Sequence, residues 1–310
     1  MEQIENQGLT EAGLQYQKEA ATAVVSPETS LGTAVVAQGG CACSTNQVES
    51  TKRADNFVYV IGKVEPRFPT LSAEKEFIQA TAFSDTVNLT DGETMYSVLT
   101  KPENRYLARQ MCWVLVVEGL DTYILRPQDP TDFSLLIDAL KPSNNLDVVI
   151  GRQGPLASPE VCHGLTLPYL LFDQLYTFDM DSLIKTIPRP DSIRPKEFTA
   201  AAKELFMKVK QMADNAGATD EYRALNYLAV RCPAIYAKTA EAFGQSCSLS
   251  KVQVRPSRLS GARKVTDAIL SYTNRQTNVI EKYFIRVDVT EEFPFLVTNL
   301  SPYYVYDQYP

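Results

Sequence analysis

Short apolar runs separated by turn residues mark out strands in this chain from residue 57 onward. The run Phe57–Ile61 is β-branched and aromatic and ends at Gly62, which is typical of a buried strand. Two later runs flank the turn sequence Glu118–Leu120 and predict a hairpin. The strands predicted for this part of the chain cover residues 57–61, 112–117, 121–125, 147–150 and 165–172.

Between these strands, apolar residues recur at the spacing of three and four that a helix requires. Ser72 is placed to cap a helix that has Glu74 and Glu76 in its first turn. Asp129 and Pro130 are typical of a helix start, with the proline at the first helical position. The helices predicted here cover residues 72–83, 93–100 and 104–111, and a fourth begins at 129.

The pattern changes after a proline-rich segment at 187–195, which favours extended chain. Beyond this segment, Phe198, Leu205, Phe206 and Val209 fall on one face of a long helix. The helices predicted in this part cover residues 198–213, 220–230 and 233–243. We expect the helical run 196–243 to pack its apolar face, through these four residues, on one side of the sheet formed by 250–300.

From about residue 250 the apolar positions repeat with a period of two. Val252 and Val254 alternate with polar residues, and so do Tyr283, Ile285 and Val287, which predicts an antiparallel sheet. The fold class is therefore α+β. We expect a mixed N-terminal α/β unit over 56–190, followed over 191–310 by a helical segment and then an antiparallel β-sheet.

The first 55 residues differ in composition from the rest. Tyr16 is their only aromatic residue, and residues 1–50 carry six glutamates against one lysine. A segment with so little to bury cannot offset the entropy of ordering. We expect residues 1–55 to be a flexible acidic arm.

The overall charge narrows the classes of partner. The chain has 30 Lys and Arg against 37 Asp and Glu, a net charge of −7, so it lacks the basic field of a nucleic-acid binder. No apolar run approaches the roughly 18 residues of a membrane span, and no secretion signal is recognisable. We expect a soluble cytoplasmic protein with no membrane partner, whose six cysteines are thiols or metal ligands rather than a disulfide framework.

Catalytic motifs are missing from the sequence. It has no Gly-x-x-x-x-Gly-Lys-Ser/Thr, Gly-x-Gly-x-x-Gly, His-Glu-x-x-His or Gly-x-Ser-x-Gly. Any triad or dyad with a histidine must use His163, the single histidine. Its neighbour Cys162 would face the other side of an extended segment. A dyad of His163 with Cys112 or Cys232 is left open, and a surface position for His163 is the simpler interpretation.

The local sequence feature that most strongly suggests a metal site is the pair Cys41 and Cys43. Cys41 and Cys43 face the same side of an extended chain, and two thiolates at this spacing can enter one zinc shell. The other two ligands must come from a separate segment, where Cys162 and His163 offer an adjacent pair. The remaining candidates are Cys112, Cys232 and Cys247, of which the first two lie in apolar stretches and suit core positions. The alternative is that Cys41 and Cys43 are free thiols in a mobile arm.

Several segments together resemble a known family. Gly-Cys-Ala-Cys at 40–43, Phe57–Gly62, the helical run Asp214–Ala229 and the closing stretch Arg286–Leu296 are similar to the C-terminal domain of PatA/PatG-type cyanobactin maturation proteases. The match is best over Arg223–Ala229, and the resemblance covers about 40 to 310. In that family this domain of unknown function follows a subtilisin-like protease that cleaves or macrocyclises precursor peptides.

The resemblance implies bound zinc, with Cys41 and Cys43 as candidate ligands. It also implies that this chain, which lacks the subtilisin triad, is not itself the protease. The favoured interpretation is a non-catalytic accessory domain that binds a precursor peptide or a subtilisin-like maturation protease, with an exposed strand adding a peptide at its edge. A zinc-dependent peptide-processing enzyme and a structural protein without a pathway link are the alternatives. A homo-oligomer is left open.

Overall fold

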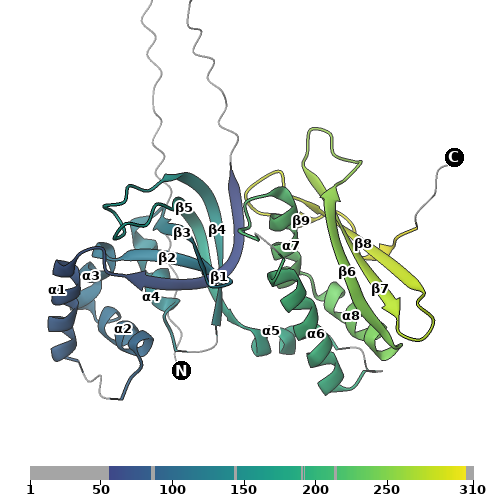
Figure 1. The fold of residues 1–310 in the computed structure, drawn as a ribbon, viewed down its shortest axis with the longest axis horizontal. Coiled ribbons are helices and arrows are strands. Elements are labelled where there is room, and N and C mark those ends of the chain that lie inside the picture. The colour runs from purple at the N-terminus through teal and green to yellow at the C-terminus, as the bar shows by residue number, and fades with distance from the viewer. Residues whose placement is uncertain are drawn as a thin grey trace, which may run out of the picture. The chain divides into compact units, whose positions relative to one another are not determined.

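The computed structural model describes residues 56–84, 88–142, 145–189, 191, 193–212 and 215–304 (Figure 1). The whole of the expected acidic arm, residues 1–55 including Cys41 and Cys43, lies outside the described residues. Within the described part, helices and two separate sheets confirm the α+β class. No helix in that part is both long and apolar enough to cross a membrane.

The first sheet closes into a five-stranded barrel. Its strands are β1 (Phe57–Arg67), β2 (Cys112–Val117), β3 (Leu120–Pro127), β4 (Asn145–Leu156) and β5 (Pro168–Asp179). They follow one another around the barrel in the order β1-β2-β3-β5-β4, and all neighbours are antiparallel except β3 and β5. The predicted strands are present, but β4 and β5 are longer than their apolar runs, because pairing with two neighbours also satisfies the backbone of their polar residues.

Four helices of the described chain lie between the barrel strands in the sequence, and they share a hydrophobic core with the barrel. They are α1 (Leu71–Ala82), α2 (Asp91–Leu99), α3 (Arg105–Gln110) and α4 (Phe133–Asp138), with short 3-10 turns at Pro102–Asn104 and Pro130–Asp132. Trp113 is buried among them, and its indole N–H donates to the Ala108 carbonyl at 2.8 Å. Thr70, and not Ser72, caps α1, because its hydroxyl accepts the Ala73 N–H. Asp129 caps as predicted, although it starts the 3-10 turn that leads into α4.

The second part of the chain contains helices followed by an antiparallel sheet. A short helix that the sequence pattern did not predict, α5 (Met180–Thr186), precedes the proline-rich segment. The other helices are α6 (Pro195–Lys210), α7 (Asp220–Arg231) and α8 (Pro233–Gly244). The sheet has the order β10-β8-β7-β6, with β9 beside β8. Its strands are β6 (Cys247–Pro256), β7 (Val265–Asn274), β8 (Ile280–Asp288), β9 (Phe295–Leu296) and β10 (Ser301–Pro302).

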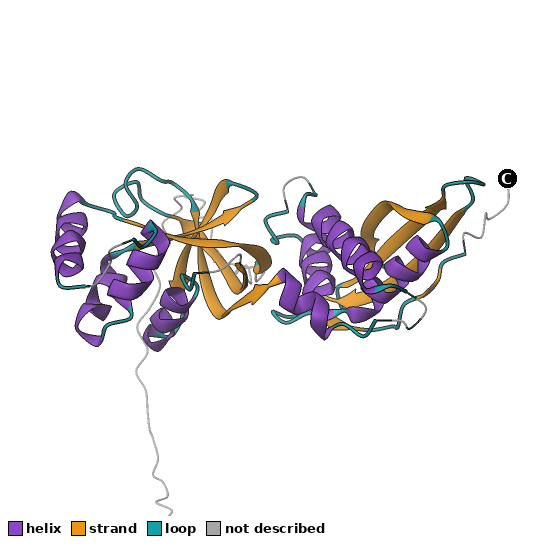
Figure 2. Cartoon of the chain, turned by 90° about the horizontal axis from the view of Figure 1, so that it is seen from below, coloured by secondary structure: helices purple, strands orange, loops and turns teal. Residues whose placement is uncertain are grey.

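Helices α6, α7 and α8 lie on the same side of this sheet (Figures 1 and 2). Phe198, Leu205, Phe206 and Val209 of α6 are buried in one core with the sheet residues, as expected. Within the helical run, α6 packs chiefly against α8, and α8 in turn packs on β6. The face of the sheet that these helices cover is called the inner face below, and the opposite face is called the outer face.

Helix α7 joins the barrel to the second sheet. Arg223, only 2% exposed, donates from its guanidinium to the carbonyls of Val289, Glu291 and Glu292 in the loop after β8. The same guanidinium lies over the ring of Phe57 at the start of β1, 5.3 Å from its centroid. One buried side chain therefore fixes the loop after β8 against the first strand of the barrel.

Candidate functional site

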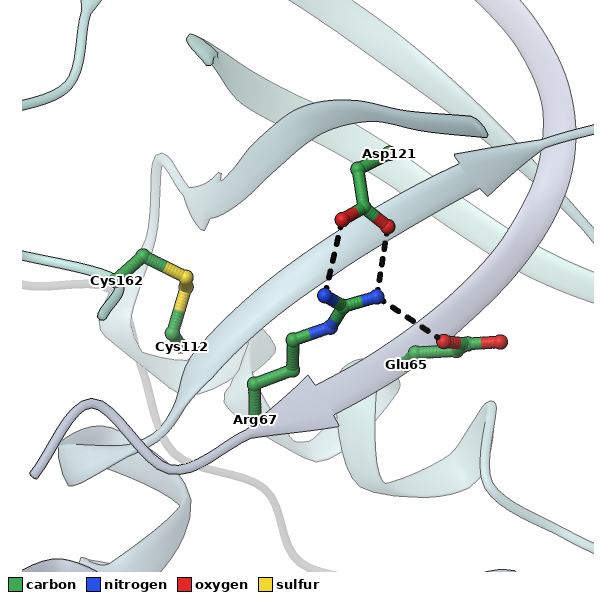
Figure 3. The surroundings of a disulfide bond; sticks show 5 residues. All are labelled: Glu65, Arg67, Cys112, Asp121 and Cys162. Atoms are coloured by element: carbon green, nitrogen blue, oxygen red, sulfur yellow. Dashed lines mark hydrogen bonds and ion pairs between the residues drawn. A yellow bond between two sulfur atoms is a disulfide. The ribbon is translucent and has the colours of Figure 1, made fainter. Parts of the chain in front are cut away.

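Cys162 has a different role from the predicted one. The structure joins it to Cys112 in a disulfide, with the two Cα atoms 5.5 Å apart (Figure 3). Both cysteines are buried, and they tie the loop between β4 and β5 to the first residue of β2. The expectation that the cysteines are all thiols or metal ligands is wrong for this pair, because a sulfur in a disulfide provides no thiolate. Cys232 and Cys247 are buried free thiols.

His163 lies next to Cys162 but faces solvent. It has a left-handed backbone conformation, with φ of 49°, and its side chain is exposed while Cys162 is buried. Hence the two residues do not form the adjacent ligand pair that a zinc site would need. Within the described residues there is no group of three or more His, Cys, Asp or Glu that could hold a metal ion. Cys162 and His163 therefore do not fit the role of zinc ligands. The ligand role of Cys41 and Cys43 stays a prediction, because both lie outside the described residues.

A bidentate ion pair lies near the disulfide (Figure 3). The guanidinium of Arg67, at the end of β1, donates to both carboxylate oxygens of Asp121 on β3, at 2.9 and 2.7 Å. Glu65 adds a longer contact to the same guanidinium at 3.5 Å. The arginine is satisfied by protein carboxylates, so this cluster supports the barrel rather than offering an anion site.

The outer face of the second sheet carries rows of cationic, polar and aromatic side chains. The register of β6, β7 and β8 aligns side chains in three rows across it: Lys251, Ser271 and Lys282; Gln253, Ile269 and Phe284; and Arg255, Asp267 and Arg286. Arg286 lies 4.8 Å from the centroid of the Phe284 ring and pairs with Asp267 at 2.9 Å. The face is therefore rich in arginine, lysine and aromatic groups.

Tyr303, which follows β10, extends this face. Its ring meets the ring of Phe284 edge to face, with 5.8 Å between the centroids. Arg255 lies over the Tyr303 ring and donates to its hydroxyl at 2.8 Å. These contacts hold the side chain of Arg255 in place, so the outer face offers a preorganised cation on strand β6.

Strand β6 ends the sheet. In the described chain its single strand neighbour is β7. The N–H of Ser257 donates to the carbonyl of Val265 at 2.7 Å, and the register pairs Arg255 with Asp267 and Gln253 with Ile269. In an antiparallel pair, the residues that bond the neighbour alternate with residues whose N–H and C=O point away. The backbone groups of Val252 and Val254 therefore point to the free edge.

Two features limit the length of this free edge. At its beginning the carbonyl of Leu249 accepts a hydrogen bond from the ammonium of Lys208 on α6, and a register shift follows between Leu249 and Lys251. At its end Pro256 occupies the next outward-pointing position, where it has no N–H to offer. The open stretch is thus Lys251–Arg255. The alternation of Val252 and Val254 predicted this strand, but its place at the edge depends on the order of strands in the sheet.

Sequence reasoning also missed a buried charged cluster at the end of the barrel. Glu292, 8% exposed, lies beside Arg152 of β4, with 3.5 Å between Nε and the carboxylate. Burial, together with the hydrogen bond and charge of Asp173 on β5, raises the pKa of Glu292 to about 7. Its Oε1 has no partner among the described residues. The two carboxyl groups are 119 positions apart in the sequence, so no local motif indicates this cluster.

Comparison with known proteins supports the family resemblance. The family model of the PatG C-terminal domain matches residues 193–303, which include α6 to α8 and the second sheet. A solved structure named PatG Domain of Unknown Function matches with a TM-score of 0.65 and 18% identity, over 80% of this chain and 99% of that one. No curated protein matches. The solved structure shows the shared fold, and the family model of the PatG C-terminal domain is matched over residues 193–303.

Proposed function

We propose that this chain is a non-catalytic peptide-recognition module of cyanobactin-type peptide biosynthesis, which binds an extended peptide by adding it to strand β6. The free edge at Lys251–Arg255 carries this proposal. The N–H and C=O groups of Val252 and Val254 point away from β7, and they match the pattern that an added antiparallel or parallel strand requires. Main-chain hydrogen bonds then supply affinity, and side chains beside the edge supply selectivity.

The PatG C-terminal match points to a domain of the cyanobactin pathway. The resemblance implies peptides and proteases as its partners, and the proposal takes one of these as the ligand. The peptide would be a segment of the precursor or an extended segment of the maturation protease. Either one must be unfolded locally to pair with β6, because a folded strand already has its neighbours. A cytoplasmic location, where precursor peptides are made, belongs to the same proposal.

A backbone substitution tests this mode of binding. Val254→Pro removes the N–H that points to the free edge while leaving the hydrogen bonds to β7 in place. Fluorescent peptides that tile a cyanobactin precursor and a subtilisin-like maturation protease would be titrated against both proteins. We expect at least one peptide to bind the wild-type chain and to lose about tenfold or more in affinity to Val254→Pro.

Val254→Ala is the matched control, because it removes the side chain but keeps the N–H. It should bind the same peptide within about threefold of wild type. Both variants should keep a cooperative unfolding transition, which shows that the sheet is intact. Binding that survives Val254→Pro in a folded protein would exclude edge addition, and the absence of binding by every tiled peptide would exclude peptide recognition.

A further inference from the structure

We infer that the segment recognised by β6 is acidic at two positions four residues apart and apolar at the two positions between them that face the helices, in the order acidic–apolar–any–apolar–acidic. This inference rests on the proposed function and specifies its ligand. In a strand added to β6, side chains opposite Lys251 and Arg255 share the outer face with them, and those opposite Val252 and Val254 share the inner face.

The charges of the outer face favour acidic partners. In the described chain, the register places two carboxylates on this face, Asp267 and Asp288. Each is taken by an arginine: Asp267 pairs with Arg286, and Asp288 with Arg263. Lys251 and Arg255 lie on the outermost strand, and both are exposed. Arg255 is directly opposite Asp267 in the register, but the carboxylate of Asp267 pairs with Arg286 on the other side. A carboxylate opposite either of them would gain a cross-strand ion pair.

The guanidinium of Arg255 is suited to this role because it is already oriented. Its contact with Tyr303 uses Nη2, and a guanidinium has five N–H donors, so further donors remain for a carboxylate. The ring of Tyr303 also restricts the side chain before a ligand arrives. A preorganised cation loses less conformational entropy on binding than a free one.

The inner side of the edge favours apolar partners. Val252 and Val254 are half-buried and pack against the core that the sheet shares with α6, α7 and α8. They lie on the last strand, so part of each side chain is left uncovered by a cross-strand neighbour. Apolar side chains on an added strand would cover this surface and remove it from water, which favours binding.

The same residues disfavour pairing of β6 with a second copy of itself. An antiparallel β6–β6 pair centred on Gln253 would place Lys251 of one copy directly opposite Arg255 of the other, twice. Like charges at directly opposite positions are destabilising. This register of self-pairing is therefore disfavoured, whereas a strand with acidic residues at the same positions is favoured.

Three matched peptides test the inference. Their central residues are Glu-Val-Ser-Val-Glu, Gln-Val-Ser-Val-Gln and Lys-Val-Ser-Val-Lys, each with the same glycine and serine flanks and a fluorophore. Affinity would be measured by fluorescence anisotropy at low and high salt. We expect the Glu peptide to bind about three- to thirtyfold more tightly than the Gln peptide, with the advantage reduced at high salt, and the Lys peptide to bind most weakly.

Charge reversal of the protein supplies the decisive control. The double variant Lys251→Glu and Arg255→Glu should prefer the Lys peptide over the Glu peptide. Lys75→Glu with Lys196→Glu, at exposed positions of α1 and α6 away from the sheet edge, should keep the wild-type order. If the Glu and Gln peptides bind equally and both are lost in Val254→Pro, edge addition stands and the acidic preference is wrong. If no peptide of this set or of the tiled set binds, the proposed function itself fails.

Discussion

The side-chain amide of Asn226, in the middle of α7, donates a hydrogen bond to the main-chain carbonyl of Tyr59 on β1, at 2.9 Å. Two segments 167 positions apart in the sequence are thereby joined through a buried polar contact. Asn226 also exchanges a pair of hydrogen bonds with Asn215, at 2.8 and 3.0 Å. The N–H of Tyr59 donates in turn to the carbonyl of Gly217. The chain before α7 therefore provides a hydrogen-bond acceptor for the first part of β1, which does not pair with β2.

Asn226→Ala should therefore destabilise the protein by about 1–3 kcal/mol, because it leaves buried groups of Tyr59 and Asn215 without partners. The free energy of unfolding would be measured by urea denaturation. Asn299→Ala, at an exposed position, is the control and should stay within about 0.5 kcal/mol of wild type. An equal effect of the two substitutions would mean that the buried amide network contributes nothing specific.

This contact illustrates what the sequence could and could not predict. The helix that carries Asn226 follows from local signals, since Thr219 caps it and two acidic residues begin it. The alternation of Tyr283, Ile285 and Val287 likewise predicts which face of β8 is buried. The closure of the barrel does not follow from the sequence, because it depends on the parallel pairing of β3 with β5 across an intervening strand in the chain. Local periodicity contains no information on such long-range pairing.

The disulfide between Cys112 and Cys162 should contribute measurably to stability. It closes a segment of 50 residues, for which loop-closure entropy gives up to about 4 kcal/mol. Thermal unfolding of the protein with and without reductant, and of the double variant Cys112→Ala with Cys162→Ala, would measure this contribution. We expect a lower midpoint in both cases.

The control for reduction is Cys232→Ala with Cys247→Ala, which removes the two buried free thiols of the described chain. The unfolding midpoint of this variant should still fall when reductant is added, because its disulfide is intact. If reductant leaves the midpoint of the wild-type protein unchanged, the two sulfurs are not joined in solution.

The sequence predicted only part of the candidate site. It predicted neither the disulfide nor the position of β6 at the edge of the sheet. The expectation of free thiols rests on a general rule for intracellular proteins, and this rule says nothing about two cysteines that the fold brings to the same position. Val252 and Val254 indicate a strand whose flanking Lys251 and Arg255 point the other way. That these cations border an open edge depends on the sheet order, which no residue of β6 specifies.

The core under the second sheet gives a direct test of packing. Phe206 is 1% exposed and meets the ring of Phe178 edge to face, with centroids 6.1 Å apart. Phe206→Ala should cost about 3–5 kcal/mol of unfolding free energy, through lost burial and the cavity that remains. The next residue, Met207, is 41% exposed, and Met207→Ala should cost much less. Similar costs at both positions would mean that α6 is rotated from the orientation described.

Stability should depend on pH through Glu292. Its pKa is raised from 4.5 in the unfolded chain to about 7 in the folded protein, mainly by burial and then by the hydrogen bond and charge of Asp173. The charged groups around it are Asp173 on β5, Arg152 on β4 and Arg223 on α7, whose guanidinium donates to the Glu292 carbonyl. Between these two pKa values the folded state holds a proton that the unfolded state has released.

The folded protein should therefore be most stabilised by this group below pH 4.5 and should lose that contribution as the pH rises toward about 7. Glu292→Gln imitates the protonated side chain and should flatten the dependence of the unfolding midpoint over this window. Glu291→Gln, at the exposed neighbouring position, should leave the dependence as it is in wild type. Differential scanning calorimetry across the window compares the three proteins. Curves that stay parallel would mean that Glu292 titrates alike in the folded and unfolded chain, and the buried carboxyl pair with Asp173 would then have to be abandoned.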